Sequence, residues 1–189
     1  EEKDEFAGIQ FSIATASYTI QSNLSGSFNC TNLAAAVALG RYCDVPAPAI
    51  VQALTDYLPA MNRVEWRKTA SNQVLLDAYN ANPTSMSLSI ENFAKWHKDG
   101  WLVLGDMFEL GEESAAEHRA IVKLVQRINM EERCILVGKH FGRTSWRGKQ
   151  FPTTGDLKTY WKENGAPKDA AILLKGSRGI ALEQLLPLL

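Results

Sequence analysis

The chain has 189 residues, with a hydrophobic content of 46%, a charged content of 22% and a formal net charge of −1. This length suits one domain or slightly more, and the composition is ordinary for a soluble globular protein. The near-zero charge gives no electrostatic reason to expect nucleic acid or an anionic membrane as the main partner. No apolar run reaches the roughly 20 residues of a membrane span, and the acidic first residues do not resemble a signal peptide.

The three cysteines, Cys30, Cys43 and Cys134, are widely spaced and include no Cys-x-x-Cys pair. Neither they nor the three histidines show the spacing of zinc ligands. We therefore expect reduced cysteines, as in a cytoplasmic protein, and no metal site built from them.

The first sixty residues predict a hairpin followed by two helices. Apolar and polar side chains alternate in two runs within residues 6–25, which is typical of a β-hairpin. A helix is expected over residues 32–40, with Asn32 as its candidate N-cap, and a second from Pro48 to Leu58. This segment has too little apolar surface for a core of its own, so we expect residues 1–59 to be the least stable part of the chain.

From about residue 60 onward, strands alternate with helices. Short apolar runs predict strands, and helices are expected after Pro83, from Ser114 with Glu117 completing a capping box, over about 156–163, and after Gly179. This alternation predicts an α/β fold with a mostly parallel, Rossmann-like sheet. The predicted strands cover residues 64–68, 74–77, 101–104, 134–137 and 171–174.

Polar residues and glycines follow four of these apolar runs. Asp77 ends one run, Gly105-Asp106 and Gly138-Lys139 follow two others, and Lys175-Gly-Ser-Arg178 follows the last. Ligands of parallel α/β sheets bind beyond the carboxyl ends of the strands. The sequence therefore predicts a binding site at this edge of the sheet.

Five motifs in the same order resemble segments of the Mur ligase family. The string Asp77-Ala-Tyr-Asn-Ala-Asn-Pro and the string Gly105-Asp-Met-Phe-Glu-Leu-Gly111 are most similar to the branch that adds D-alanyl-D-alanine. The others are Gly26-Ser-Phe-Asn-Cys-Thr-Asn32 with the alanines that follow it, Asn62-Arg-Val-Glu65 and Lys175-Gly-Ser-Arg178. Together they extend over most of the chain.

The resemblance implies a division of the chain into two parts. Residues 1–59 are expected to be the C-terminal part of a central ATP-binding domain, and residues 60–189 a complete Rossmann-like C-terminal domain. No Gly-x-x-x-x-Gly-Lys-Ser/Thr phosphate loop occurs in the sequence. We therefore expect the isolated chain to be inactive, with the phosphate loop and the Mg²⁺ ligands in another part of the enzyme.

The resemblance also implies a reaction and its partners. In the branch of the family that adds D-alanyl-D-alanine, ATP phosphorylates the carboxylate of UDP-N-acetylmuramoyl-tripeptide, and the amine of D-alanyl-D-alanine attacks the acyl phosphate in a step of peptidoglycan synthesis. Positioning and charge stabilisation are the main tasks of such an enzyme.

Candidate nucleotide ligands follow from the matching positions. Arg63 is expected at the ATP phosphates, Asp77 at the ribose hydroxyls, and Asn29 and Asn32 near the adenine, whereas the amides of Asn80 and Asn82 suit a nucleotide or a dipeptide. Structural roles compete with these assignments: a surface pair between Arg63 and Glu65, a turn or cap at Asp77, and turn or cap positions for the asparagines.

Candidate substrate ligands lie later in the chain. Gly105 and Asp106 are expected to line the substrate side of the cleft, and the resemblance places Lys175, Ser177 and Arg178 near the dipeptide carboxylate. Glu109 and His118 also match the family, but we expect a structural role for His118.

Two other functions compete with the ligase. The first alternative is a nucleotide- or peptide-binding α/β module without catalysis. The second is another ligase of the same superfamily, such as a folylpolyglutamate synthase. The basic and aromatic residues of 139–149 suggest nucleic-acid binding as a further alternative. One short cluster in a neutral chain is weak support for it, so a solvated loop is favoured. A Rossmann oxidoreductase is disfavoured because no Gly-x-Gly-x-x-Gly follows a strand.

Overall fold

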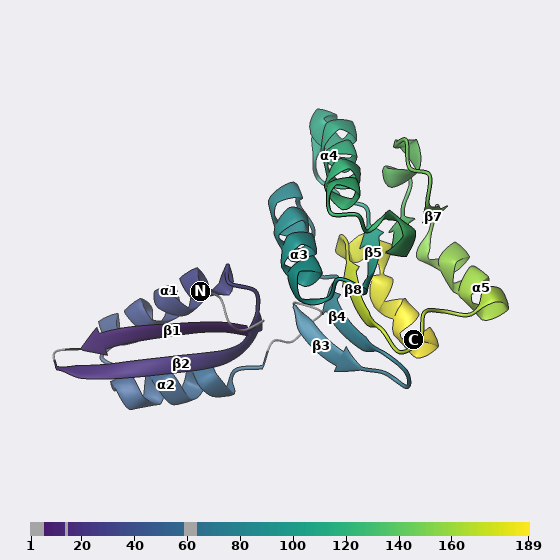
Figure 1. Ribbon diagram of the computed structural model, residues 1–189. Coiled ribbons are helices and arrows are strands. Elements are labelled where there is room, and N and C mark those ends of the chain that lie inside the picture. The colour runs from purple at the N-terminus through teal and green to yellow at the C-terminus, as the bar shows by residue number, and fades with distance from the viewer. Residues whose placement is uncertain (1–5, 14, 59–63) are drawn as a thin grey trace. The chain divides into compact units, whose positions relative to one another are not determined.

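The computed structural model describes residues 6–13, 15–58 and 64–189. It divides into two compact units, Glu1–Ala60 and Met61–Leu189, which are described separately (Figure 1).

The first unit is a hairpin with two helices packed beside it. Strands β1 (Phe6–Ile13) and β2 (Ala16–Ser25) are antiparallel, and they contact helices α1 (Asn29–Tyr42) and α2 (Ala47–Asp56). Side chains alternate between the helices and solvent along both strands, which confirms the predicted hairpin. The buried core of this unit is small and consists of Ala7, Ile20, Leu33, Val37 and Ile50.

The first helix begins earlier than predicted, and Asn32 is not its N-cap. Helix α1 starts at Asn29, after Phe28, so Asn32 lies inside the first turn. The side-chain amide of Asn29 donates to the backbone oxygen of Ser25 over 2.8 Å. Several polar residues near this helix start are suited to a cap, and the local sequence pattern does not show at which residue the helix begins.

The second unit contains a six-stranded sheet in the order β3-β4-β8-β5-β6-β7. All neighbours pair in parallel except β3, which is antiparallel to β4 at the edge, so the predicted mostly parallel α/β fold is confirmed. The strands are β3 (Glu65–Lys68), β4 (Gln73–Asp77), β5 (Trp101–Gly105), β6 (Cys134–Val137), β7 (Lys149–Phe151) and β8 (Ala171–Lys175).

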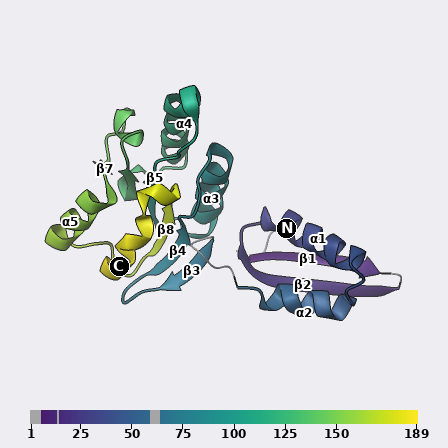
Figure 2. The same ribbon diagram turned by 180° about the vertical axis from the view of Figure 1, so that it is seen from behind.

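Helices cover both faces of this sheet. Helices α3 (Pro83–Trp96) and α4 (Ser114–Arg127) lie on one face, and α5 (Thr154–Asn164) lies on the other with the C-terminal 3-10 segment Leu182–Leu188 (Figures 1 and 2). Alternate strand residues enter two separate cores, so that Leu102 and Leu104 face α3 and α4 whereas Val103 faces α5. Burial on both faces explains why β4, β5, β6 and β8 are continuous apolar runs.

Strand β7 and two helix ends differ from the sequence prediction. Strand β7 was not predicted because it is a three-residue edge strand with exposed Lys149 and Gln150. The predicted capping box at Ser114 is wrong, since Glu113 precedes the helix without a side-chain cap. A capping box occurs instead at Asn82 and Ser85, at the start of α3.

Hydrogen exchange on the whole chain tests the predicted difference in stability between the units. We expect the amides of β1 and β2 to exchange at least about tenfold faster than those of β4, β5 and β8, because the first core is much smaller. Equal protection of Ile20 and Leu104 would contradict this expectation.

Candidate functional site

The strand order places three of the sequence motifs at one edge of the sheet. Strand β8 lies between β4 and β5, so their carboxyl ends are neighbours. The loops that start at Asp77, Gly105 and Lys175 therefore meet there, although 98 residues separate Asp77 from Lys175 in the chain. Sequence reasoning predicted such an edge, but it did not show how these side chains contact one another.

Asp77 and Lys175 form a buried ion pair at this edge. The ammonium nitrogen of Lys175 lies 2.6 Å from Oδ2 of Asp77, and only 1% of the lysine side chain is exposed. The hydroxyl of Ser89 donates to the same carboxylate oxygen over 2.8 Å. Each buried charge therefore has a partner of opposite charge. These contacts join β4, β8 and α3.

The two asparagines of the following loop have structural contacts. Oδ1 of Asn80 accepts from the amide of Ala81 over 2.9 Å, and Asn82 caps α3 by accepting from the amide of Ser85 over 2.8 Å. The backbone oxygen of Asn80 also lies 3.4 Å from the Lys175 ammonium. Both asparagine residues are exposed, so their side-chain amides remain accessible at the edge.

Gly105 and Gly176 allow the loops after β5 and β8 to touch. A Cβ atom on Gly176 would lie 2.8 Å from the Cα of Gly105, which leaves no room for a side chain. Two hydrogen bonds then link the loops in opposite directions. The amide of Ser177 donates to the backbone oxygen of Asp106, and the amide of Phe108 donates to the hydroxyl of Ser177. Ser177 is buried by this contact.

Asp106 is a buried residue whose carboxylate binds the backbone of a neighbouring loop. Its two oxygens accept from the amides of His140 and Phe141, over 2.8 and 2.9 Å, and the residue is 1% exposed. Gly138 makes this approach feasible, because its φ is +130° and a Cβ there would overlap the carboxylate. The predicted substrate-side position of Asp106 therefore corresponds to a buried anchor between β5 and β6.

His118 is fully buried beside Asp106 and has a defined tautomer. Its Nδ1 lies 2.7 Å from the backbone oxygen of Ser114, which can only accept, so Nδ1 carries the proton. Its Nε2 accepts from the amide of Met107 over 3.1 Å. Burial lowers the pKa of His118 below its ordinary value of 6.5, against the opposing effects of Ser114 and Asp106, so the ring is neutral at pH 7.

Among the candidates that the structure describes, Arg178 presents a charge to solvent. It is exposed, and its guanidinium carbon lies 5.5 Å from the centre of the Tyr79 ring, in a cation–π contact. Tyr79 was not predicted as a site residue, nor were Ser89 and His140, because their roles depend on contacts between segments far apart in the chain.

The remaining candidates belong to the first unit or fall outside the described residues. Asn29 is buried, and its Oδ1 accepts from the side-chain amide of the exposed Asn32 over 2.9 Å. Arg63 lies outside the described residues. The competing pair between Arg63 and Glu65 therefore also stays untested, and Glu65 contacts Arg67 over 2.8 Å.

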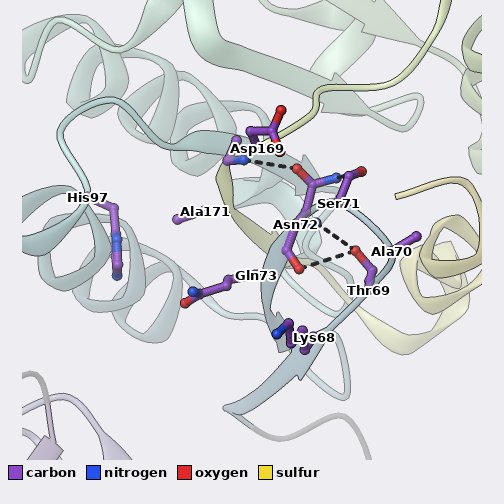
Figure 3. Close-up of a pocket in the computed structure, with 10 residues that line it drawn as sticks. Lys68, Thr69, Ala70, Ser71, Asn72, Gln73, His97, Asp169 and Ala171 are labelled. Atoms are coloured by element: carbon purple, nitrogen blue, oxygen red, sulfur yellow. Dashed lines mark hydrogen bonds between the residues drawn. The ribbon is translucent and has the colours of Figure 1, made fainter.

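A pocket of about 460 Å³ lies at the opposite, amino end of β4 and β8 (Figure 3). Lys68, Asn72, Gln73, Asp169 and Ala171 are among the residues that line it. The side-chain amide of Asn72 is used structurally, since it donates to the backbone oxygens of Pro167 and Leu189 and accepts from the amide of Ala170. This pocket is separate from the edge where the motifs meet.

Comparison with known proteins gives a family and named relatives. The profile of the family "Mur ligase, glutamate ligase domain" matches residues 62–178. UDP-N-acetylmuramoyl-tripeptide–D-alanyl-D-alanine ligase from Bacillus subtilis is 31% identical over 94% of this chain and 41% of its own length. The ligase of the same name from Escherichia coli is 33% identical over 94% of this chain and 40% of its own length.

A solved structure has the same fold. UDP-N-acetylmuramoylalanyl-D-glutamyl-2,6-diaminopimelate–D-alanyl-D-alanyl ligase from Acinetobacter baumannii matches with a TM-score of 0.81 and 25% identity. The match covers 96% of this chain and 40% of that chain. The present chain thus spans about two fifths of the length of the relatives it matches.

The buried ion pair predicts a large effect of removing one partner. Lys175→Met leaves the Asp77 carboxylate buried without a cation, and we expect the free energy of unfolding to fall by about 3–5 kcal/mol. Combining it with Asp77→Leu should recover most of the loss. Urea unfolding measures both values.

The matched control is the exposed pair of Arg127 with Glu91, at 2.8 Å. Arg127→Met should cost less than about 1 kcal/mol, because solvent screens this pair. A Lys175→Met effect as small as that of Arg127→Met would show that the buried pair does not hold the edge together.

The lowered pKa of His118 predicts a loss of stability in acid. As the pH falls through 6.5, the unfolded chain binds a proton that the folded chain does not, so the folded state is disfavoured. We expect the stability advantage of the wild type over His118→Gln to shrink by about 1 kcal/mol between about pH 7.5 and about pH 5.5. Urea unfolding at both pH values checks this, and a constant difference would contradict it.

Proposed function

This chain belongs to the Mur ligase family, and we propose that it is the C-terminal part of an ATP-dependent ligase that joins D-alanyl-D-alanine to UDP-N-acetylmuramoyl-tripeptide. In this proposal, residues 1–59 complete a central ATP-binding domain and residues 60–189 form the C-terminal domain. Such an enzyme would act in the cytoplasm, in the synthesis of a peptidoglycan precursor. The names of the relatives from Bacillus subtilis and Escherichia coli support this activity.

One structural observation carries the proposal. Two strings resemble the D-alanyl-D-alanine-adding branch, Asp77–Pro83 at the end of β4 and Gly105–Gly111 at the end of β5. The segment Lys175–Arg178 lies at the end of β8, between these two strands. Hydrogen bonds between these loops make a single surface of them. That surface lies at the carboxyl edge, where α/β sheets bind their ligands.

The proposed reaction forms an amide in two steps. A carboxylate oxygen of the tripeptide attacks the γ-phosphorus of ATP, and ADP leaves. The amine of D-alanyl-D-alanine then attacks the acyl carbon, loses a proton and displaces inorganic phosphate. This chain would contribute orientation and charge, which are large effects in such reactions.

Within this reaction, exposed and buried candidates take different roles. Arg178 would bind the carboxylate of the dipeptide, because a guanidinium matches two carboxylate oxygens and keeps its charge. The accessible amides of Asn80 and Asn82 would contact nucleotide or dipeptide, with Arg63 at the ATP phosphates. Gly105 and the buried residues Asp77, Asp106, Lys175 and Ser177 would shape the surface, while Asn29 and Asn32 would lie near the adenine.

The phosphate-binding loop and the Mg²⁺ ligands are assigned to the rest of the enzyme. In residues 6–13, 15–58 and 64–189, no three His, Cys, Asp or Glu side chains cluster in a way that could hold a metal ion. No step is therefore assigned to a metal bound by these residues. None of the helices in the described part of the chain has the length and apolar character needed to cross a membrane.

A glutamate-adding ligase is the second candidate. The matching family carries glutamate ligase in its description, and folylpolyglutamate synthase was an alternative on sequence grounds. The two activities differ in the amine acceptor, so an acceptor comparison separates them.

The decisive test is ATP-dependent phosphate release by the full-length enzyme that contains this chain. We expect release with UDP-N-acetylmuramoyl-tripeptide and D-alanyl-D-alanine, little release with glutamate as acceptor, and none from residues 1–189 alone. Release with glutamate on a folate substrate would favour the second candidate. If no phosphate is released with either acceptor, the result favours a binding module without catalysis.

Variants within the full-length enzyme test the role of Arg178. Arg178→Gln removes a charge-assisted contact, and we expect kcat/KM for D-alanyl-D-alanine to fall by about 10- to 100-fold. Arg127→Gln, on the exposed end of α4, is the matched control and should leave kcat/KM unchanged. Equal values for both variants would remove Arg178 from the proposed site.

A further inference from the structure

Three different elements hold three successive amides of the loop after β5. The amide of Asp106 donates to the backbone oxygen of Val137 in β6 over 3.0 Å. The amide of Met107 donates to Nε2 of His118 in α4, and the amide of Phe108 donates to the hydroxyl of Ser177 after β8. A loop held in this way has little freedom to adopt another path.

This loop also contains a strained residue. Glu109 has a φ of +63°, in the left-handed region that side chains other than glycine rarely occupy, and Gly111 follows with a φ of +52°. Strain of this kind persists only where neighbouring contacts determine the backbone. The anchored amides of Met107 and Phe108 immediately precede Glu109 and supply that constraint.

The anchored loop presents two side chains at the proposed binding edge. Phe108 is 38% exposed although it is a large apolar residue, and Glu109 is exposed beside it. The Phe108 ring lies against Gly179, where an added Cβ would come within 2.7 Å of it. Phe108 is therefore next in space to the segment that carries Arg178.

His118 is the one titratable group among the three anchors. It has no exposed surface, and the groups that face it are Asp106, His140, Phe141, Ser114 and, through its charge, Glu117. Oδ1 of Asp106 lies 3.6 Å from Nε2, but that nitrogen already accepts from the Met107 amide. Both ring nitrogens are thus committed to backbone groups, which excludes direct proton transfer to a substrate.

We propose that neutral His118 is a positioning residue that fixes the loop Asp106–Leu110, so that Phe108 and Glu109 form part of the substrate surface. The inference rests on the proposed ligase function for the substrate and on the hydrogen bonds for the loop. His118 acts through the Met107 amide and does not touch the reacting groups.

Two substitutions separate the hydrogen bonds of His118. Asparagine is long enough to donate to Ser114 as Nδ1 does, but it is too short to reach the Met107 amide. Glutamine places a carbonyl oxygen near the position of Nε2, where it can accept from that amide. His118→Asn therefore removes the proposed contact, and His118→Gln is the matched variant that retains it.

Hydrogen exchange of the 189-residue chain measures directly how well the Met107 amide is held. We expect the Met107 amide to exchange at least about tenfold faster in His118→Asn and less than about threefold faster in His118→Gln. The amide of Ser85, which Asn82 caps, should be unchanged in both. An unchanged Met107 rate in His118→Asn overturns the proposal, as does equal acceleration in both variants.

If His118→Asn does not fold, a measurement on the wild-type chain tests the proposal instead. Acid that protonates His118 removes the acceptor for Met107, so the protection of the Met107 amide should fall relative to that of Leu104. A constant ratio of the two overturns the proposal.

Kinetics of the full-length enzyme then test the link to substrate. We expect His118→Asn to lower kcat/KM for D-alanyl-D-alanine by at least about tenfold, and His118→Gln to keep it within about threefold of wild type. Faster amide exchange with unchanged kcat/KM overturns the role in substrate binding and leaves the ligase function intact. A wild-type enzyme without ligase activity overturns the proposed function, and with it the substrate role of the loop.

Discussion

The buried contact between Asp77 and Lys175 is the interaction on which the carboxyl edge of the sheet depends. It joins the ends of β4 and β8, and through Ser89 it reaches α3. An ion pair in this position stabilises the fold only if both charges and their remaining hydrogen-bond positions are satisfied. The contacts of Lys175 with Asn80 and of Asp77 with Ser89 meet part of that requirement, so the pair also fixes where the next loop begins.

Asp106 has the same role between β5 and β6, with backbone amides in place of a cation. A carboxylate that accepts two amide hydrogen bonds organises the loop that donates them, here the segment after Gly138. Asp77 and Asp106, which the sequence suggested as ligands, therefore also have contacts within the framework. The residues that remain available to a ligand are exposed ones, such as Asn80, Asn82, Phe108 and Arg178.

The fold could be predicted from the sequence because apolar runs and turn residues report local structure and burial. Four strands of the second unit followed from such runs, and β3 from its place before the turn at Ser71-Asn72. Strand β7 is too short and too exposed to give an apolar run. Contacts between loops could not be predicted, since they depend on strand order. Nothing near Asp77 indicates that Lys175 will be its partner, and nothing near Ser114 indicates that its hydroxyl will face His140 in place of capping α4.

A framework ordered before any ligand arrives has a consequence for specificity. Binding does not have to order the loops after β4, β5 and β8, because ion pairs and hydrogen bonds inside the protein already hold them. The strained backbone at Glu109 is likewise maintained by contacts that no ligand supplies. Differences in acceptor between related ligases would then arise from the exposed side chains on a common framework, and substitutions in the buried network would change affinity for all acceptors alike.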